Sequence, residues 1–167
     1  MTPLSCDELK SCASDLVSRL ISSNHRVATA ESCTGGWVAK LITDVAGSSA
    51  CFDCSLVTYS NQAKQELLGV PGQTLNDFGA VSQETVKAMV LGLLDRCSAN
   101  MGVAISGIAG PGGGSAEKPV GTVWLAWARP GQVIECVRYQ FEGDRDAVRR
   151  QAAYQALKGI ERLMLHG

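Results

Sequence analysis

The stretch "ATAESCTGGW", residues 28–37, joins a short apolar run to a pair of glycines through a serine, a cysteine and a threonine. The run "RVATA", residues 26–30, predicts a buried strand, and the apolar spacing after Trp37 predicts a helix that stops near Gly47. A junction between a strand and a helix is a common place for a nucleophile. Ser32, Cys33 and Thr34 are therefore three candidates that the stretch itself does not separate.

Helices and strands alternate on both sides of this junction. Helices are predicted at 7–23, 37–47, 61–69, 83–99 and 145–165, and strands at 26–30, 54–60, 101–106, 120–128 and 133–141. The pair Pro-Gly in "RPGQ", residues 129–132, suits a tight turn, so the last two strands are predicted to form an antiparallel hairpin. We expect an α/β fold: one domain over residues 1–167, in three α/β/α layers around a mixed parallel/antiparallel sheet. In such sheets the site lies beyond strand ends, here after residues 30, 60 and 106.

The bulk composition limits the partners. The chain has 167 residues, which fits one domain, and its 15 Lys+Arg against 16 Asp+Glu remove the general electrostatic case for nucleic-acid binding. No run of about 18 apolar residues exists to span a bilayer. The first residues also lack the basic and apolar regions of a signal peptide. We expect a cytoplasmic protein with neither nucleic-acid nor membrane partners.

Seven cysteines occur without a regular framework, as expected of reduced thiols in a cytosolic protein. Cys51 and Cys54 form a single CxxC, but no second CxxC and no nearby histidine pair completes a zinc site. No metal site is predicted.

The choice of catalytic base is narrow because the chain has two histidines. His25 precedes Ser32 by seven positions, or roughly 20 Å in an extended chain, which is beyond hydrogen-bond reach. His166 is the penultimate residue and is expected to be frayed. A pair of histidine with serine or cysteine is therefore disfavoured.

The segment "TYSNQAK", residues 58–64, offers another base. Lys64 falls in the first turn of a predicted helix, where the helix dipole disfavours a charged amine, and partial burial would add to the shift. A neutral Lys64 can accept a serine proton, and Tyr59 could relay that proton or align the two groups. The alternative is a solvated lysine beside a tyrosine at the end of a strand, which is the more common arrangement for this segment alone.

Three glycine or arginine segments are candidates for substrate binding. Gly35 and Gly36 each cost about 1 kcal/mol relative to alanine in a helix, so they suggest backbone N–H groups near a ligand or an oxyanion. Close packing of a helix on a strand explains them equally well. The loop "SGIAGPGGGSAEKP", residues 106–119, lacks the ending of a P-loop and predicts one pocket wall.

Arg145 and Arg149 lie four residues apart in "GDRDAVRRQ" and hence on one helical face, where they suit a phosphate. An exposed helix with Asp–Arg pairs is the alternative.

The motifs "AESCTGG", "VTYSN..K", "GAVS", "SGIAGP.GG", "KPVGTV" and "GDRDAVRRQA" occur in this order. Over residues 9–163 the chain thereby resembles the CinA carboxy-terminal domain family. The resemblance implies hydrolysis of the carboxamide of nicotinamide mononucleotide to nicotinate mononucleotide and ammonia. It also implies a serine nucleophile with lysine and tyrosine partners, which fall on Ser32, Lys64 and Tyr59.

The resemblance implies no metal or bound cofactor, and a homo-oligomer with a dimer favoured. The expected substrate-binding residues are Thr34, Gly35, Gly36, Ser106, Gly107, Gly110 and Arg145. Two other hypotheses stay open: a nucleotide-binding module without turnover, and Cys33 as the nucleophile, because thiolates are intrinsically better nucleophiles.

Overall fold

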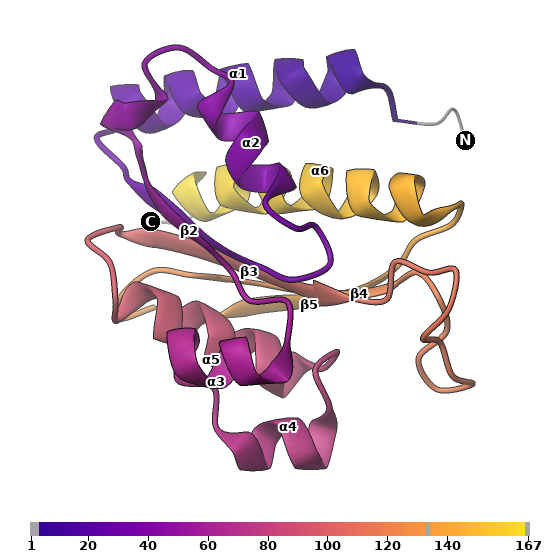
Figure 1. Ribbon diagram of the computed structural model, residues 1–167. Coiled ribbons are helices and arrows are strands. Elements are labelled where there is room, and N and C mark those ends of the chain that lie inside the picture. The colour runs from indigo at the N-terminus through magenta and orange to yellow at the C-terminus, as the bar shows by residue number, and fades with distance from the viewer. Residues whose placement is uncertain (1–3, 133, 166–167) are drawn as a thin grey trace.

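A five-stranded sheet forms the centre of the protein, whose computed structural model describes residues 4–132 and 134–165 (Figure 1). The strand order is β2-β1-β3-β4-β5. The strands are β1 (Val27–Glu31), β2 (Phe52–Val57), β3 (Met101–Gly107), β4 (Thr122–Ala128) and β5 (Glu135–Gln140). Strands β1, β2 and β3 are parallel, whereas β4 is antiparallel to both β3 and β5. The predicted α/β class with a mixed sheet is confirmed.

Helices cover both faces of the sheet, as Figure 1 shows. The helices are α1 (Cys6–Ser22), α2 (Trp37–Thr43), α3 (Asn61–Leu68), α4 (Gly72–Phe78), α5 (Gln83–Leu94) and α6 (Arg145–Leu165), with a 3-10 turn η1 (Ser48–Ala50). Helices α1, α2 and α6 lie on one face, and α3, α4 and α5 on the other. Two apolar clusters result, one on each side of the sheet.

The central strands β1 and β3 are mostly apolar because helices bury both of their faces. Every residue of β1 is buried, and β3 is buried up to Ser106. On the α6 side, Trp127 is fully buried and its indole N–H donates to the carbonyl of Ala156 at 3.0 Å. A Cβ at Gly159 would lie 2.0 Å from that ring, so this glycine lets α6 approach β4. These contacts fix α6, and with it the arginines of its first turns.

Several predicted boundaries are wrong. Strand β2 begins two residues earlier and ends at Val57, so Tyr59 lies in the loop that follows it. Helix α5 ends at Leu94 rather than near 99, because the following segment turns back so that Ser98 can bond Asp53. Helix α4 was not predicted, since its single buried residue, Leu75, leaves no apolar period to detect.

Two further predictions, a strand that starts at Val133 and a frayed His166, fall on positions outside the described residues.

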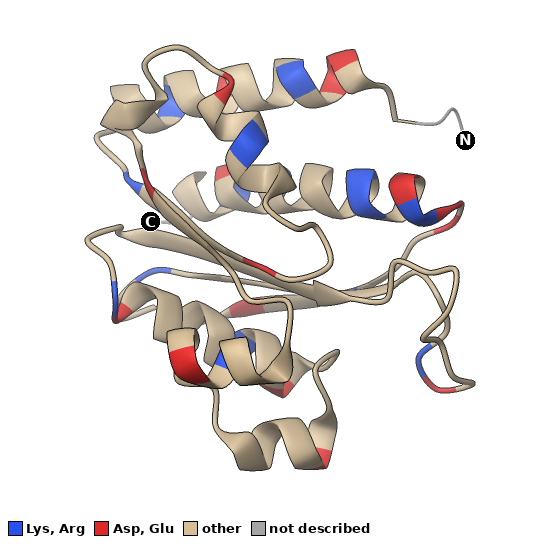
Figure 2. Cartoon of the chain, in the orientation of Figure 1, with Lys and Arg blue, Asp and Glu red and all other residues tan. Residues whose placement is uncertain are grey.

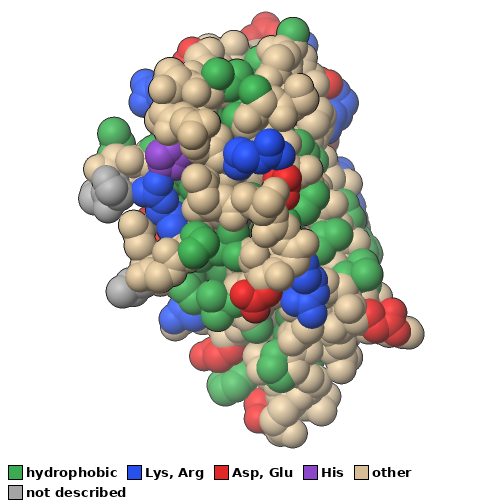
Figure 3. Space-filling model, turned by 90° about the vertical axis from the view of Figure 1, so that its left-hand side faces the viewer, with side chains coloured by type: hydrophobic (Ala, Val, Ile, Leu, Met, Phe, Trp, Pro, Cys, Tyr) green, Lys and Arg blue, Asp and Glu red, His purple; other side chains and the backbone are tan. Residues whose placement is uncertain are grey.

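Charges of both signs are interspersed over the elements (Figure 2). Figure 3 shows the end of the molecule where β1, β2 and β3 begin, and there too acidic and basic side chains alternate with apolar ones. Within the described ranges, no helix has the length and apolarity needed to cross a membrane.

Candidate active site

A pocket of about 270 Å³ lies where the parallel strands end. The connection after β1 runs over one face of the sheet through α2, and the connection after β2 runs over the other through α3. Such a divergence leaves a crevice at the carboxyl ends of the strands. The pocket is lined by Ser32, Cys33, Tyr59, Lys64, Ala80, Val81, Ser106, Gly107, Ile108, Ala109, Gly110, Gly112, Gly113 and Arg145.

Ser32 and Lys64 meet at the base of this pocket. Ser32 directly follows β1, and its N–H donates to the carbonyl of Ile105 at 3.0 Å, which ties it to β3. The Nζ atom of Lys64 lies 3.1 Å from Oγ of Ser32 and donates to the carbonyl of Thr58 at 2.8 Å. Ser60 caps α3 by accepting from the N–H of Ala63 at 3.0 Å, so Lys64 occupies the first turn.

Lys64 as a residue is only 1% exposed, and this burial lowers the pKa of its amine. Within residues 4–132 and 134–165, no carboxylate forms an ion pair with it. The charged form therefore lacks both water and a counterion, and the neutral amine is favoured. A neutral amine can donate to Thr58 and still use its lone pair to accept the hydroxyl proton of Ser32.

A buried carboxylate holds the loop that carries Ser32. Glu31 is fully buried at the N-terminus of α2, where the helix dipole stabilises an anion. Its oxygens accept from the hydroxyls of Thr29 (3.2 Å) and Thr34 (2.7 Å) and from the N–H groups of Gly36 (3.0 Å), Val38 (3.2 Å) and Ala39 (2.9 Å). The first N–H groups of a helix have no acceptor within the helix, and the carboxylate of Glu31 supplies one. These hydrogen bonds also fix residues 32–36 against the start of α2.

The two glycines have a conformational role instead of the predicted one. Gly35 and Gly36 have φ of +61° and +93°, a region that glycine adopts without steric cost. The N–H of Gly35 donates to the carbonyl of Ser32 at 3.0 Å, and that of Gly36 donates to Glu31. Thr34, Gly35 and Gly36 do not line the pocket. The expectation that these glycine N–H groups approach the substrate is not met, because the loop itself uses them.

Other N–H groups at the pocket are free. Among the described residues, the N–H groups of Cys33, Ala109 and Gly110 donate to no acceptor of another residue. All three residues line the pocket. Cys33 directly follows Ser32, which is where an N–H can reach an oxyanion formed at Ser32.

Cys33 itself is a poor nucleophile. Its side chain is 5% exposed, and burial raises the pKa of its thiol to about 12. The thiolate is therefore scarce at neutral pH, which argues against the cysteine alternative.

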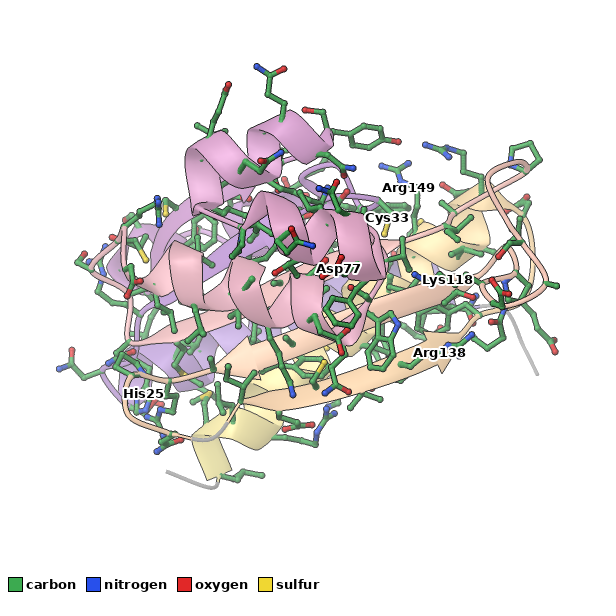
Figure 4. The ribbon with its side chains drawn as sticks, turned by 90° about the horizontal axis from the view of Figure 1, so that it is seen from below. His25, Cys33, Asp77, Lys118, Arg138 and Arg149 are labelled. Atoms are coloured by element: carbon green, nitrogen blue, oxygen red, sulfur yellow. The ribbon has the colours of Figure 1, made fainter. Side chains whose placement is uncertain are left out.

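Arg149 of α6 holds the backbone beside Ser32 (Figure 4). Its guanidinium donates to the carbonyls of Cys33 and Thr34, both at 3.0 Å, and lies 5.1 Å from the ring centre of Trp37. In a trans peptide the N–H points away from the carbonyl. By binding the two carbonyls, Arg149 therefore also sets the directions of the N–H groups of the same peptides, those of Thr34 and Gly35.

The pocket mouth is formed by Arg145 and Tyr59. Arg145 donates to the hydroxyl of Tyr59 at 2.9 Å and to the carbonyl of Gly110 at 2.8 Å. Tyr59 is 61% exposed, and this is the hydrogen bond that its hydroxyl makes, rather than one with Ser32 or Lys64. Ser106 is 2% exposed and donates to the carbonyl of Ala80 at 2.7 Å. A Cβ at Gly107 would lie 2.6 Å from Val123, so this position accommodates only glycine.

Seven of the predicted residues thus lie together: Ser32, Tyr59, Lys64, Ser106, Gly107, Gly110 and Arg145. Figure 4 places His25 at the opposite end of the molecule from Cys33, so it cannot serve as a base for Ser32. Sequence reasoning missed the apolar wall of Ala80, Val81 and Ile108 and the part played by Glu31. A charged residue inside an apolar strand was the available signal for Glu31.

Comparisons with known proteins identify the family of the chain. A family model described as "CinA C-terminal domain" matches residues 9–164. "Nicotinamide-nucleotide amidohydrolase PncC" of Escherichia coli (strain K12) is 53% identical over 153 residues, which cover 92% of this chain and 93% of that protein. The protein of the same name from Enterobacter agglomerans is 58% identical over 132 residues, or 79% and 80% of the two chains. The crystal structure of the competence/damage inducible protein CihA from Agrobacterium tumefaciens superimposes with a TM-score of 0.92 at 41% identity, over 98% of this chain and 99% of that one.

Proposed function

The chain belongs to the CinA C-terminal domain family, and we propose that it is an amidohydrolase that converts nicotinamide mononucleotide to nicotinate mononucleotide and ammonia. The relatives named nicotinamide-nucleotide amidohydrolase support the reaction and the substrate. The observation that carries the mechanism is the buried Lys64 amine, 3.1 Å from the hydroxyl of Ser32.

The reaction proceeds through an acyl-enzyme. Oγ of Ser32 attacks the carboxamide carbon while the neutral amine of Lys64 takes the hydroxyl proton. The N–H of Cys33 and one N–H from Ala109 or Gly110 stabilise the oxyanion. The C–N bond then breaks, and the ammonium of Lys64 returns the proton to the leaving nitrogen, which departs as ammonia.

Hydrolysis repeats these steps with water. Lys64 takes a proton from the attacking water, the ester bond to Ser32 breaks, and the serine oxygen recovers its proton as the nicotinate product leaves. Each proton that Lys64 accepts is returned within the cycle, and the reaction as proposed requires no metal or bound cofactor.

The pocket walls suit the two ends of the substrate. Ala80, Val81 and Ile108 give an apolar surface for the flat pyridine ring above Ser32. Arg145, at the mouth and in the first turn of α6, faces the phosphate with a planar pair of donors. Tyr59 orients Arg145 through their hydrogen bond, a role that differs from both sequence expectations, a proton relay or the alignment of Ser32 and Lys64.

The proposal also covers the setting of the reaction. We place the enzyme in the cytoplasm, where its seven free cysteines would stay reduced. We propose a homo-oligomer with a dimer favoured, which light scattering after size-exclusion chromatography tests directly. Neither nucleic acid nor a membrane takes part in the proposed reaction.

Ammonia release from nicotinamide mononucleotide tests the function. Ser32→Ala should lower kcat by more than about 10⁴-fold, because no other group supplies the nucleophile. Ser115→Ala, an exposed serine in the loop after β3, is the matched control and should keep wild-type turnover. Unchanged turnover in Ser32→Ala would contradict the nucleophile, and nucleotide binding by calorimetry without any ammonia from the wild type would instead identify a binding module.

A further inference from the structure

A second chemical cluster lies outside the active pocket. The carboxylate of Asp53 and the thiols of Cys54 and Cys97 place their ligand atoms within 4.8 Å of one another. Asp53 and Cys54 belong to the edge strand β2, and Cys97 lies between α5 and β3. In the described part of the chain, this is the only group of three such side chains with the spacing of a metal site.

An irregularity in β2 explains why two neighbouring residues face the same way. Val27 pairs with Phe52 and Thr29 with Ser55, so two steps along β1 correspond to three along β2. Side chains alternate between faces in a regular strand, whereas a bulge re-aims them. The bulge at Asp53 and Cys54 lets both side chains reach Cys97.

The pair of thiols is not the one suggested by the sequence. Cys51 of the CxxC is fully buried in the apolar cluster beneath α1, α2 and α6. Cys54 and Cys97 are both half-buried and pack against the cluster on the opposite face of the sheet. The tertiary structure therefore replaces Cys51 with Cys97, which is 43 positions away from Cys54 along the chain.

Asp53 is held in place with one acceptor position to spare. Oδ1 accepts from Arg26 at 2.7 Å and from the hydroxyl of Ser98 at 3.0 Å, and Oδ2 accepts from the N–H of Ser98 at 3.0 Å. A carboxylate offers about four lone-pair positions, so one remains on Oδ2. Carboxylates that bind metals are themselves commonly oriented by such hydrogen bonds.

We propose that Asp53, Cys54 and Cys97 form a binding site for a thiophilic divalent cation of the Zn²⁺ class, with water as the fourth ligand. Two thiolates and a carboxylate are typical zinc ligands, and tetrahedral coordination needs one more donor. Binding displaces the two thiol protons and forms two metal–sulfur bonds without any change of oxidation state. The three negative ligands are balanced by the cation together with the guanidinium of Arg26.

The bound cation would connect the edge strand β2 to the segment between α5 and β3. Both parts lead toward pocket residues, since β2 runs to Tyr59 and β3 runs to Ser106. A disulfide between Cys54 and Cys97 is the competing chemistry. Its formation requires a two-electron oxidant, whereas metal binding leaves the oxidation state of the sulfurs unchanged.

Cadmium and zinc titrations of the reduced, metal-free full chain test the site. Cd²⁺ reports coordination by thiolates through its ultraviolet charge-transfer absorption, and a chromophoric chelator measures Zn²⁺ affinity by competition. We expect the wild type to bind one equivalent of metal and to show the charge-transfer absorption with Cd²⁺. Cys54→Ser and Cys97→Ser should lose both the binding and the absorption. Asp53→Asn should keep the absorption but weaken Zn²⁺ binding by at least about tenfold.

Cys136→Ser is the matched control, because Cys136 is also half-buried and has its pKa raised to about 11, yet lies outside the cluster. Melting of each metal-free variant establishes first that it folds. Added Zn²⁺ should then raise the Tm of the wild type and of Cys136→Ser by several degrees, with no rise in Cys54→Ser. An equal rise in Cys54→Ser would overturn the proposal, as would a Cys54–Cys97 disulfide that forms in place of metal uptake.

Discussion

The two loops that wall the pocket are held in contrasting ways. Residues 32–36, after β1, are fixed locally by the buried carboxylate of Glu31 and by Arg149. Residues 108–121, after β3, are exposed from 111 to 117. Contacts with distant parts of the chain hold this second loop. Arg145 donates to the carbonyl of Gly110 and Arg138 to that of Glu117, while Lys118 of the loop donates to the carbonyl of Phe78. Figure 4 labels Lys118 and Arg138.

The difference separates two tasks. Reacting atoms must be placed to within fractions of an ångström, which a short loop with dense buried hydrogen bonds achieves. A substrate-binding wall needs access, and its contacts with other elements keep it in place without closing it. Variants in the first loop should therefore change kcat and stability, and variants in the second should change KM.

After Ser32→Ala, the largest effect is expected from the buried base behind the first loop. Lys64→Met, which keeps the length of the side chain without an ionisable group, should lower kcat by about 10²–10⁴-fold. In the wild type, activity should rise with pH through the lowered pKa of Lys64 and then level off, because only the neutral amine accepts a proton. Initial rates of ammonia release across the pH range measure both effects.

The same pKa predicts the sign of a stability change. Between the lowered pKa of Lys64 in the folded protein and the ordinary pKa of lysine, the unfolded chain binds more protons than the folded chain. The free energy of unfolding should therefore increase with pH in that window. Lys64→Met should remove this slope, and Lys118→Met should retain it. A pH–rate profile of the wild type without an acidic limb would exclude Lys64 as the base.

The next largest effect should come from the carboxylate that organises the first loop. Glu31→Gln replaces an acceptor of five hydrogen bonds with a group whose NH₂ would face N–H donors. The free energy of unfolding should fall by about 3 kcal/mol, because hydrogen bonds to a buried charge are lost. Urea unfolding measures the loss.

The same substitution in the second loop, Glu117→Gln, provides the comparison. Glu117 is exposed, and its change should stay within about 0.5 kcal/mol. Equal urea-unfolding midpoints for Glu31→Gln and Glu117→Gln would disprove the expectation that the first loop contributes more to stability than the second.

Substitutions of two arginines of α6 should affect different kinetic constants, kcat in one case and KM in the other. Arg149→Ala releases the carbonyls of Cys33 and Thr34 and should lower kcat by about 10²-fold through misplacement of the reacting groups, with little effect on KM. Arg145→Ala should raise the KM for the mononucleotide about tenfold. In this variant, the KM for the mononucleotide and the KM for the unphosphorylated nucleoside should then be nearly equal. Steady-state kinetics with both substrates distinguish the two, and a reversed pattern would exchange their assigned roles.

The smallest effect is expected at the tip of the second loop. Lys118→Ala removes one exposed hydrogen bond to the carbonyl of Phe78, so KM should change less than about threefold and stability by less than about 0.5 kcal/mol. Lys10→Ala on α1 serves as the control for loss of a surface charge. A large loss of kcat in Lys118→Ala would mean that the second loop also positions the reacting atoms.

Part of this site was predictable from neighbouring residues. The first-turn position of Lys64 follows from the cap residues just before it, and the distance of His25 from Ser32 follows from the length of one strand. The pairing of Tyr59 with Arg145 was not predictable, because it depends on where α6 meets the loop after β2. The use of the Gly35 and Gly36 N–H groups was also missed, since it depends on the buried position of Glu31.

The sequence by itself determined the alternation of helices and strands, the strand ends that carry Ser32 and Ser106, the position of Lys64 in the first turn of a helix, and the lack of a histidine near Ser32. These properties depend on periodicity and short spacings, which a single chain displays directly. Only the tertiary structure decided the burial that lowers the pKa of Lys64, which N–H groups remain free for an oxyanion, and the meeting of Cys54 with Cys97. Burial and contacts between distant residues arise when layers pack against one another, and a linear pattern contains neither.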